Sequence, residues 1–147
     1  MSIADQIQQD TKAAMKNRDR RRVETLRMLN AALKNGEIEA GRSLSEEEEQ
    51  AVLRRQLKQR EESAEAFGKA GREEQAASEA AEAEVVREYL PAPLSEDELE
   101  RIVEQAIDET GASEMKDMGR VMGRATALAG GRADGRHLAA LVRGRLQ

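Results

Sequence analysis

The C-terminal 33 residues carry side chains whose type and spacing suit the binding of a polyanion. Residues 115–147 hold seven lysines and arginines against two aspartates, a net charge of +5, in a chain whose overall charge is −5. Because salt screens charges beyond about 10 Å, the local balance decides what such a surface attracts. Lys116, Arg120 and Arg124 recur at intervals of four, so a helix would carry them as one row. The row predicts a helix face that contacts phosphate groups.

Two further cations flank the glycine-rich turn that follows this row. We expect all five to converge near residues 130–135 and the start of the last helix, where free backbone amides also favour anions. The predicted phosphate-binding residues are Lys116, Arg120, Arg124, Arg132 and Arg136. A solvated helix face without a ligand is the alternative. A second basic row surrounds an expected interhelix turn, and solvation is its simpler interpretation; it consists of Lys16, Arg18, Arg20, Arg21 and Arg22.

Glycines accompany the C-terminal row. Gly119 and Gly123 lie four residues apart on the same expected helix. A glycine inside a helix costs about 1 kcal/mol relative to alanine. Close approach of a neighbouring helix backbone would offset this cost, and so would approach of a ribose or phosphate. Gly131 and Gly135 lie in and after the following turn and complete the set of expected close-approach glycines.

An acidic segment directly precedes the basic one. Residues 95–114 hold eight aspartates and glutamates against Arg101 alone, a net charge of −7. The two segments would neutralise each other if their side chains paired within the fold. The nucleic-acid interpretation therefore depends on whether the five cations stay open or pair with the carboxylates of residues 96–109.

No arrangement of residues predicts catalysis, a metal site or a cofactor. His137 is the only histidine and has no metal-binding motif around it, and the chain has no cysteine. The serines at positions 43, 45, 95 and 113 suit helix caps or loops. No Ser–His–Asp triad and no glycine-rich loop after a strand can be assembled.

Composition limits the remaining possibilities. Phe67 and Tyr89 are the only aromatic residues among 147, so the core must be aliphatic and base stacking on aromatics is almost excluded. No stretch approaches the roughly 18 apolar residues of a membrane span, and the absence of cysteine fits a reducing compartment. We expect a soluble, cytoplasmic protein.

Apolar residues recur at helical spacing throughout, which predicts an all-α fold. A first helix should begin at Ile3 and end near Asn17, and a second should fade in the region of residues 36–41. Ser45 with Glu48 forms a capping box that opens a long helix, interrupted at residues 68–71 and followed by another helix to Leu90.

Prolines then mark a domain boundary, because the residue before a proline disfavours helical geometry. Pro91 and Pro93 separate an N-terminal domain of long antiparallel helices, residues 1–92, from a small three-helix C-terminal domain, residues 93–147. In the second domain we expect a capping box at residues 95–98, a helix end at Gly111, a cap at Ser113, a break at residues 130–131 and a last cap at Asp134.

Six segments occur in an order and spacing known from one protein family. They are residues 26–39, residues 58–63, residues 66–67 with 69–72, Tyr89-Leu-Pro91 with Leu94-Ser95, Asp117-Met-Gly-Arg-Val-Met122 and Gly131-Arg-Ala-Asp-Gly135. On these segments the chain resembles the GatB/YqeY family. Its members are small free-standing proteins related to the tail of the B subunit of glutamine-dependent tRNA amidotransferase.

The resemblance implies a helical N-terminal domain followed by a tail domain of the kind that helps the amidotransferase hold tRNA. The chain lacks the B subunit's large body and the amidase Ser–Ser–Lys apparatus, so we do not expect it to transfer an amide alone. We predict a non-catalytic, tRNA-associated module that binds structured RNA. The alternatives are a protein–protein adaptor acting through the long N-terminal helices, and an accessory subunit of a carbon–nitrogen ligase with glutamine as amido donor.

Overall fold

The computed structural model describes all 147 residues, and they form seven α-helices, one short 3-10 helix and no strand. The predicted all-α class is therefore confirmed. The helices divide into two compact units, residues 1–90 and residues 91–147, each with its own apolar core. None of the helices combines the length and the apolar character needed to cross a membrane.

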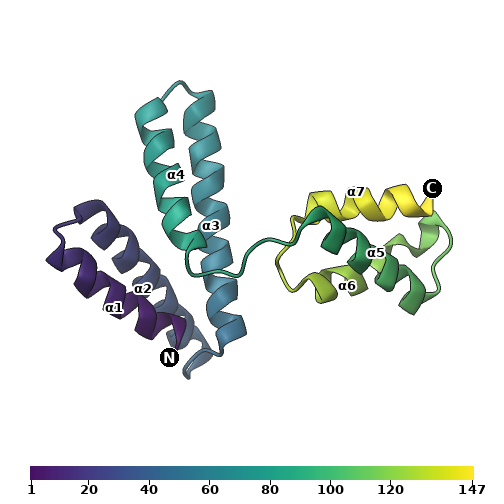
Figure 1. Ribbon diagram of the computed structural model, residues 1–147, viewed down its shortest axis with the longest axis horizontal. Helices are drawn as coiled ribbons and strands as arrows, with labels where there is room; N and C mark the ends of the chain where they lie inside the picture. Colours follow the sequence, from purple (N-terminus) through teal and green to yellow (C-terminus); the bar gives the residue numbers. More distant parts are fainter. The chain divides into compact units, whose positions relative to one another are not determined.

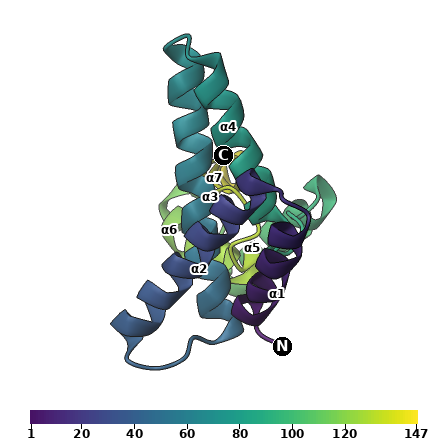
Figure 2. The same cartoon turned by 90° about the vertical axis from the view of Figure 1, so that its left-hand side faces the viewer.

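The first unit consists of two helix pairs. Helices α1 (Ile3–Lys16) and α2 (Arg20–Ala40) are antiparallel, and α3 (Glu46–Lys69) and α4 (Glu73–Arg87) form a hairpin whose tip extends beyond the α1–α2 pair (Figures 1 and 2). Its core is aliphatic, as the composition requires, and its largest fully buried side chains are Ile7, Leu26, Leu29, Leu33, Leu53 and Val86.

A buried carboxylate joins α1 to α3. Glu49 is only 4 % exposed although it lies in a run of four glutamates. Its oxygens accept hydrogen bonds from the backbone amides of Ile3, at 3.2 Å, and Ala4, at 2.9 Å. These amides belong to the first turn of α1 and have no acceptor within that helix. The negative charge also lies at the positive end of the α1 dipole, so Glu49 caps α1 from another helix.

Tyr89 anchors the end of the first unit. It follows α4, is 8 % exposed, and donates a hydrogen bond from its hydroxyl to the carboxylate of Asp10 on α1. Burial raises the pKa of Tyr89, and the hydrogen bond to Asp10 raises it further. The last residues before Pro91 are thereby held against α1.

The second unit contains α5 (Glu96–Thr110), the 3-10 helix η1 (Met115–Asp117), α6 (Met118–Ala129) and α7 (Gly135–Leu146). The capping boxes predicted at Ser45 and Ser95 are both formed, Gly111 ends α5 in a left-handed conformation, and Asp134 caps α7. The apolar core of the unit is built by side chains from all three long helices: Leu99, Val103, Ala106, Val121, Ala125, Leu138, Val142 and Leu146.

One predicted cap is wrong. Ser113 does not begin the helix that carries the basic row, because α6 starts five residues later at Met118 with Asp117 at its N-cap position. Lys116 therefore lies in the 3-10 turn that precedes α6 and not on α6 itself. The row predicted for a single α-helix begins outside that helix.

Removal of the Glu49 carboxylate should destabilise the first unit. Glu49→Ala leaves two amides at the start of α1 without an acceptor, and unsatisfied buried donors cost about 1–3 kcal/mol. Glu49→Gln keeps one acceptor oxygen and should lose less. Urea unfolding followed by circular dichroism measures the difference, with the exposed neighbour Glu47→Ala as control for the charge at the start of α3. Equal losses for Glu49→Ala and Glu47→Ala would contradict the assigned role.

Candidate nucleic-acid interface

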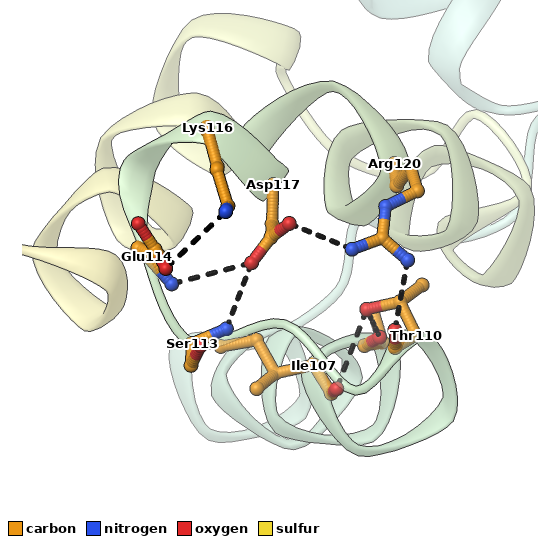
Figure 3. Close-up of polar contacts among 8 residues, drawn as sticks. Ile107, Thr110, Ser113, Glu114, Lys116, Asp117 and Arg120 are labelled. Atoms are coloured by element: carbon orange, nitrogen blue, oxygen red, sulfur yellow. Dashed lines mark hydrogen bonds and ion pairs between the residues drawn. The ribbon is translucent and has the colours of Figure 1, made fainter.

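Asp117 organises the turn between α5 and α6 (Figure 3). Asp117 is only 8 % exposed. One carboxylate oxygen accepts hydrogen bonds from the backbone amides of Ser113, at 3.0 Å, and Glu114, at 3.3 Å. The other oxygen accepts from the guanidinium of Arg120 at 2.7 Å. Asp117 thus closes the turn and at the same time orients an arginine on α6.

Arg120 is held from two sides. Besides Asp117, its guanidinium donates to the carbonyl oxygen of Thr110, the last residue of α5, at 3.0 Å (Figure 3). Its side chain is still 61 % exposed. The guanidinium therefore presents a fixed orientation to solvent, which lowers the entropy lost when a further acceptor binds.

The hydrogen bonds to Asp117 stabilise its charged form. The amide of Ser113, and then the guanidinium of Arg120, lower the pKa of Asp117 from its ordinary 3.8 to about 2. A carboxylate with a lowered pKa stabilises the fold above its unfolded-state pKa and loses this contribution as the pH falls toward the folded-state value.

The other two cations of the row remain exposed but paired. Lys116 lies 3.5 Å from Glu114. Arg124 forms an ion pair with Glu109, which lowers the pKa of Glu109. Among the five predicted RNA-binding residues, Arg124 is thus the one that pairs with the acidic segment of residues 96–109.

Arg132 and Arg136 lie at the other end of α5. The side chain of Arg132 donates to the carbonyl oxygen of Ala92 at 2.9 Å, and its own carbonyl accepts from the amide of Leu94 at 3.1 Å. Arg136 is exposed in the first turn of α7, and its side chain has no partner. Because Arg120 lies beside the last residue of α5 and Arg132 beside the segment before its first, the expected convergence of five cations at residues 130–135 is wrong.

The predicted close approach of a neighbouring helix to the glycines is not found. A Cβ atom placed on Gly119, Gly123 or Gly135 would meet no atom within 4 Å, so no neighbouring helix backbone lies against them. The reason is that α6 buries its opposite side, through Val121 and Ala125. Gly131 instead has a φ of 79°, a left-handed conformation that glycine adopts without strain.

Gly119, Arg120, Gly123 and Arg124 therefore form an exposed surface, which we call the α6 face. It combines two oriented arginines with helix backbone that no side chain covers at the glycines. Such a surface can bring backbone and guanidinium groups close to an anion. Nothing in this arrangement supplies a nucleophile with a neighbouring base, and no three metal-ligating side chains come together.

The central role of Asp117 was not predicted. The family motif Asp117-Met-Gly-Arg120 contained the signal, because an acid and an arginine at i and i+3 on a helix start are within reach of each other. A pair between His137 and Glu96, 2.7 Å apart at the starts of α7 and α5, was also missed. Both of its residues are exposed.

Asp117→Asn should change the acid sensitivity of the second unit. Above about pH 4 the variant loses the stabilisation that the charged carboxylate provides, whereas near pH 2 the wild-type carboxylate is itself becoming protonated. The difference in free energy of unfolding between the two proteins should therefore shrink as the pH falls from 5 to 2. Urea titrations at a series of pH values measure it, and Asp108→Asn, which alters an exposed aspartate on α5, serves as control.

Gly123→Ala should stabilise α6. The alanine methyl meets open space, and alanine is favoured over glycine inside a helix by about 1 kcal/mol. Gly119→Ala should gain less, because Gly119 lies in the first turn. A thermal melt measures both. A loss of stability in Gly123→Ala would show that α6 is covered at this position.

The family model described as Yqey-like protein matches residues 4–146, nearly the whole chain. No curated protein matches the chain in sequence. The match includes the motif around Asp117 and both helical units, and the chain therefore belongs to the YqeY-like family.

Proposed function

We propose that this protein is a non-catalytic module that binds structured RNA, and tRNA is the ligand to test first. The observation that carries the proposal is the α6 face, where oriented arginines flank uncovered helix backbone. Lys116 extends the face at the start of α6, and Arg132 and Arg136 supply a second contact point at the other end of α5. Membership of the YqeY-like family supports the comparison with the tRNA-holding tail of the amidotransferase.

The intramolecular ion pairs are compatible with binding. The side chains of Arg124 and Glu109 are 45 % and 39 % exposed, and those of Lys116 and Glu114 are more exposed still. Exposed ion pairs contribute about 0–1 kcal/mol each, so a phosphate can replace the carboxylate at little cost. A guanidinium also matches phosphate geometry with two parallel hydrogen bonds.

The same proposal assigns roles to the two units. Residues 93–147 are the tail-type RNA-binding domain and residues 1–92 a separate helical domain, in a protein that works in the cytoplasm. Backbone shape and phosphate contacts dominate recognition, because the second unit has no phenylalanine, tyrosine or tryptophan on which a base could stack.

Binding of folded tRNA should weaken steeply with salt. Four or five phosphate contacts by the second unit contribute about −3 to −4 to the slope of log affinity against log salt. The triple variant Lys116→Gln/Arg124→Gln/Arg136→Gln should bind more weakly and with a shallower slope, and filter binding at several salt concentrations measures both. Arg143→Gln/Arg145→Gln removes charge from the same unit outside the proposed contacts and should change binding less.

Gly123→Ala adds an independent readout, because the proposal expects it to weaken RNA binding while it stabilises the helix. Gly144→Ala on α7, which also meets open space, should leave binding unchanged. Absence of tRNA binding at low salt would refute the proposed function, and so would unchanged binding by the triple variant.

Two alternative functions have distinct outcomes in the same experiments. An adaptor that acts through the N-terminal helices would recover one stoichiometric protein in a pull-down that ribonuclease does not affect. An accessory subunit of a carbon–nitrogen ligase would raise glutamine-dependent amidation of mischarged Glu-tRNA or Asp-tRNA when added to a partner that bears the catalytic residues. Amidation by the purified chain alone would contradict the non-catalytic assignment.

A further inference from the structure

The first unit carries a second basic surface around the turn between α1 and α2. Residues 12–27 hold seven cations against Asp19 and Glu24, a net charge of +5. Arg21 donates to the hydroxyl of Ser78, and Arg22 pairs with Glu88. The remaining five cations are exposed and form no ion pair. They are Lys12, Lys16, Arg18, Arg20 and Arg27, and we call them the basic turn.

The basic turn is one surface that spans two helices. The guanidinium of Arg27 on α2 approaches the sulfur of Met15 on α1 at 4.0 Å, directly beside Lys16 in sequence. Arg18 lies in the connecting turn and Arg20 begins α2. Cations from both helices and from the turn thus lie at the same end of the α1–α2 pair.

Several features of the basic turn oppose folding. Arg18 has a φ of 58°, in the left-handed region that disfavours residues other than glycine, asparagine and aspartate. The first turn of α2 holds three arginines, and the only acid at this helix start is the N-cap Asp19, whose carboxylate accepts from the amide of Arg22. Neither Arg18 nor Arg20 forms an ion pair within the chain. Strain and charge that the fold does not need are typical of a binding site.

We propose that the basic turn binds RNA phosphate groups. This inference rests on the proposed function, which supplies the RNA. Arginine predominates in residues 12–27, and its planar fork suits phosphate oxygens. The N-terminus of α2, where Asp19 caps the amide of Arg22, lies at the same place. No aromatic side chain lies in this segment, so the contact reads the backbone of the RNA and not its bases.

The test compares matched variants of the full chain on folded tRNA. Lys16→Gln/Arg18→Gln/Arg20→Gln removes three charges from the basic turn, and Arg54→Gln/Arg55→Gln/Lys58→Gln removes three charges from α3 in the same unit. The first variant should reduce the steepness of the salt slope by about 2–3 and weaken binding at least tenfold at low salt. The α3 variant should stay close to wild type.

Arg18→Gly separates binding from folding. It removes one phosphate contact and also relieves the left-handed backbone, so its melting temperature should rise while its affinity for tRNA falls. A fold defect would lower both. A fall in melting temperature, or an unchanged affinity, would count against the role assigned to Arg18.

The outcomes distinguish this inference from the proposed function. If the α6 variants weaken binding and the basic-turn variant does not, the inference is wrong and the proposed function stands. If only the basic-turn variant weakens binding, the inference stands and the α6 face is not the RNA site. Equal effects of the basic-turn and α3 variants would overturn the inference, because net charge alone would then explain binding. A wild-type chain that does not bind tRNA overturns both.

Discussion

Both units depend on one constraint: backbone amides that leave water at the start of a helix or in a tight turn must find an acceptor. Each unit meets it with a buried carboxylate from a distant or neighbouring position. Glu49 accepts from two amides of α1, and Asp117 accepts from two amides of the turn before α6. In each case one side chain both satisfies the backbone and fixes the relative position of two segments. The orientation of Arg120 follows directly from the second of these contacts.

Local signals predicted most helix ends, because a capping box or a left-handed glycine acts within a few residues. The structure has the predicted N-caps at Ser45, Ser95 and Asp134 and the predicted helix end at Gly111. The role of Glu49 could not be found in this way. It belongs to a run of four similar glutamates, and only the packing of α1 against α3 buries one of them. Ser113 suited a cap equally well, yet Asp117 holds its amide inside the turn.

The candidate site was predicted in its residues but not in its arrangement. The division of five cations between the two ends of α5 depends on the antiparallel packing of α5 and α6, which no local pattern encodes. The exposure of Gly119 and Gly123 could have been predicted from the sequence, since both positions fall opposite the apolar stripe of Val121 and Ala125 on a helical wheel. The ion pair between Arg124 and Glu109 joins residues 15 positions apart, and only the folded structure shows which acid pairs with which arginine.

Tyr89 has a practical consequence. It is the only tyrosine, the chain has no tryptophan, and residues 91–147 contain no phenylalanine, tyrosine or tryptophan. The protein therefore carries an intrinsic optical label confined to its first unit, buried and hydrogen-bonded to Asp10. Tyrosine emission reports the state of that unit alone, whereas helicity reports both. Recorded together on one unmodified sample, the two signals distinguish a chain that folds as a single cooperative block from one whose halves come apart independently.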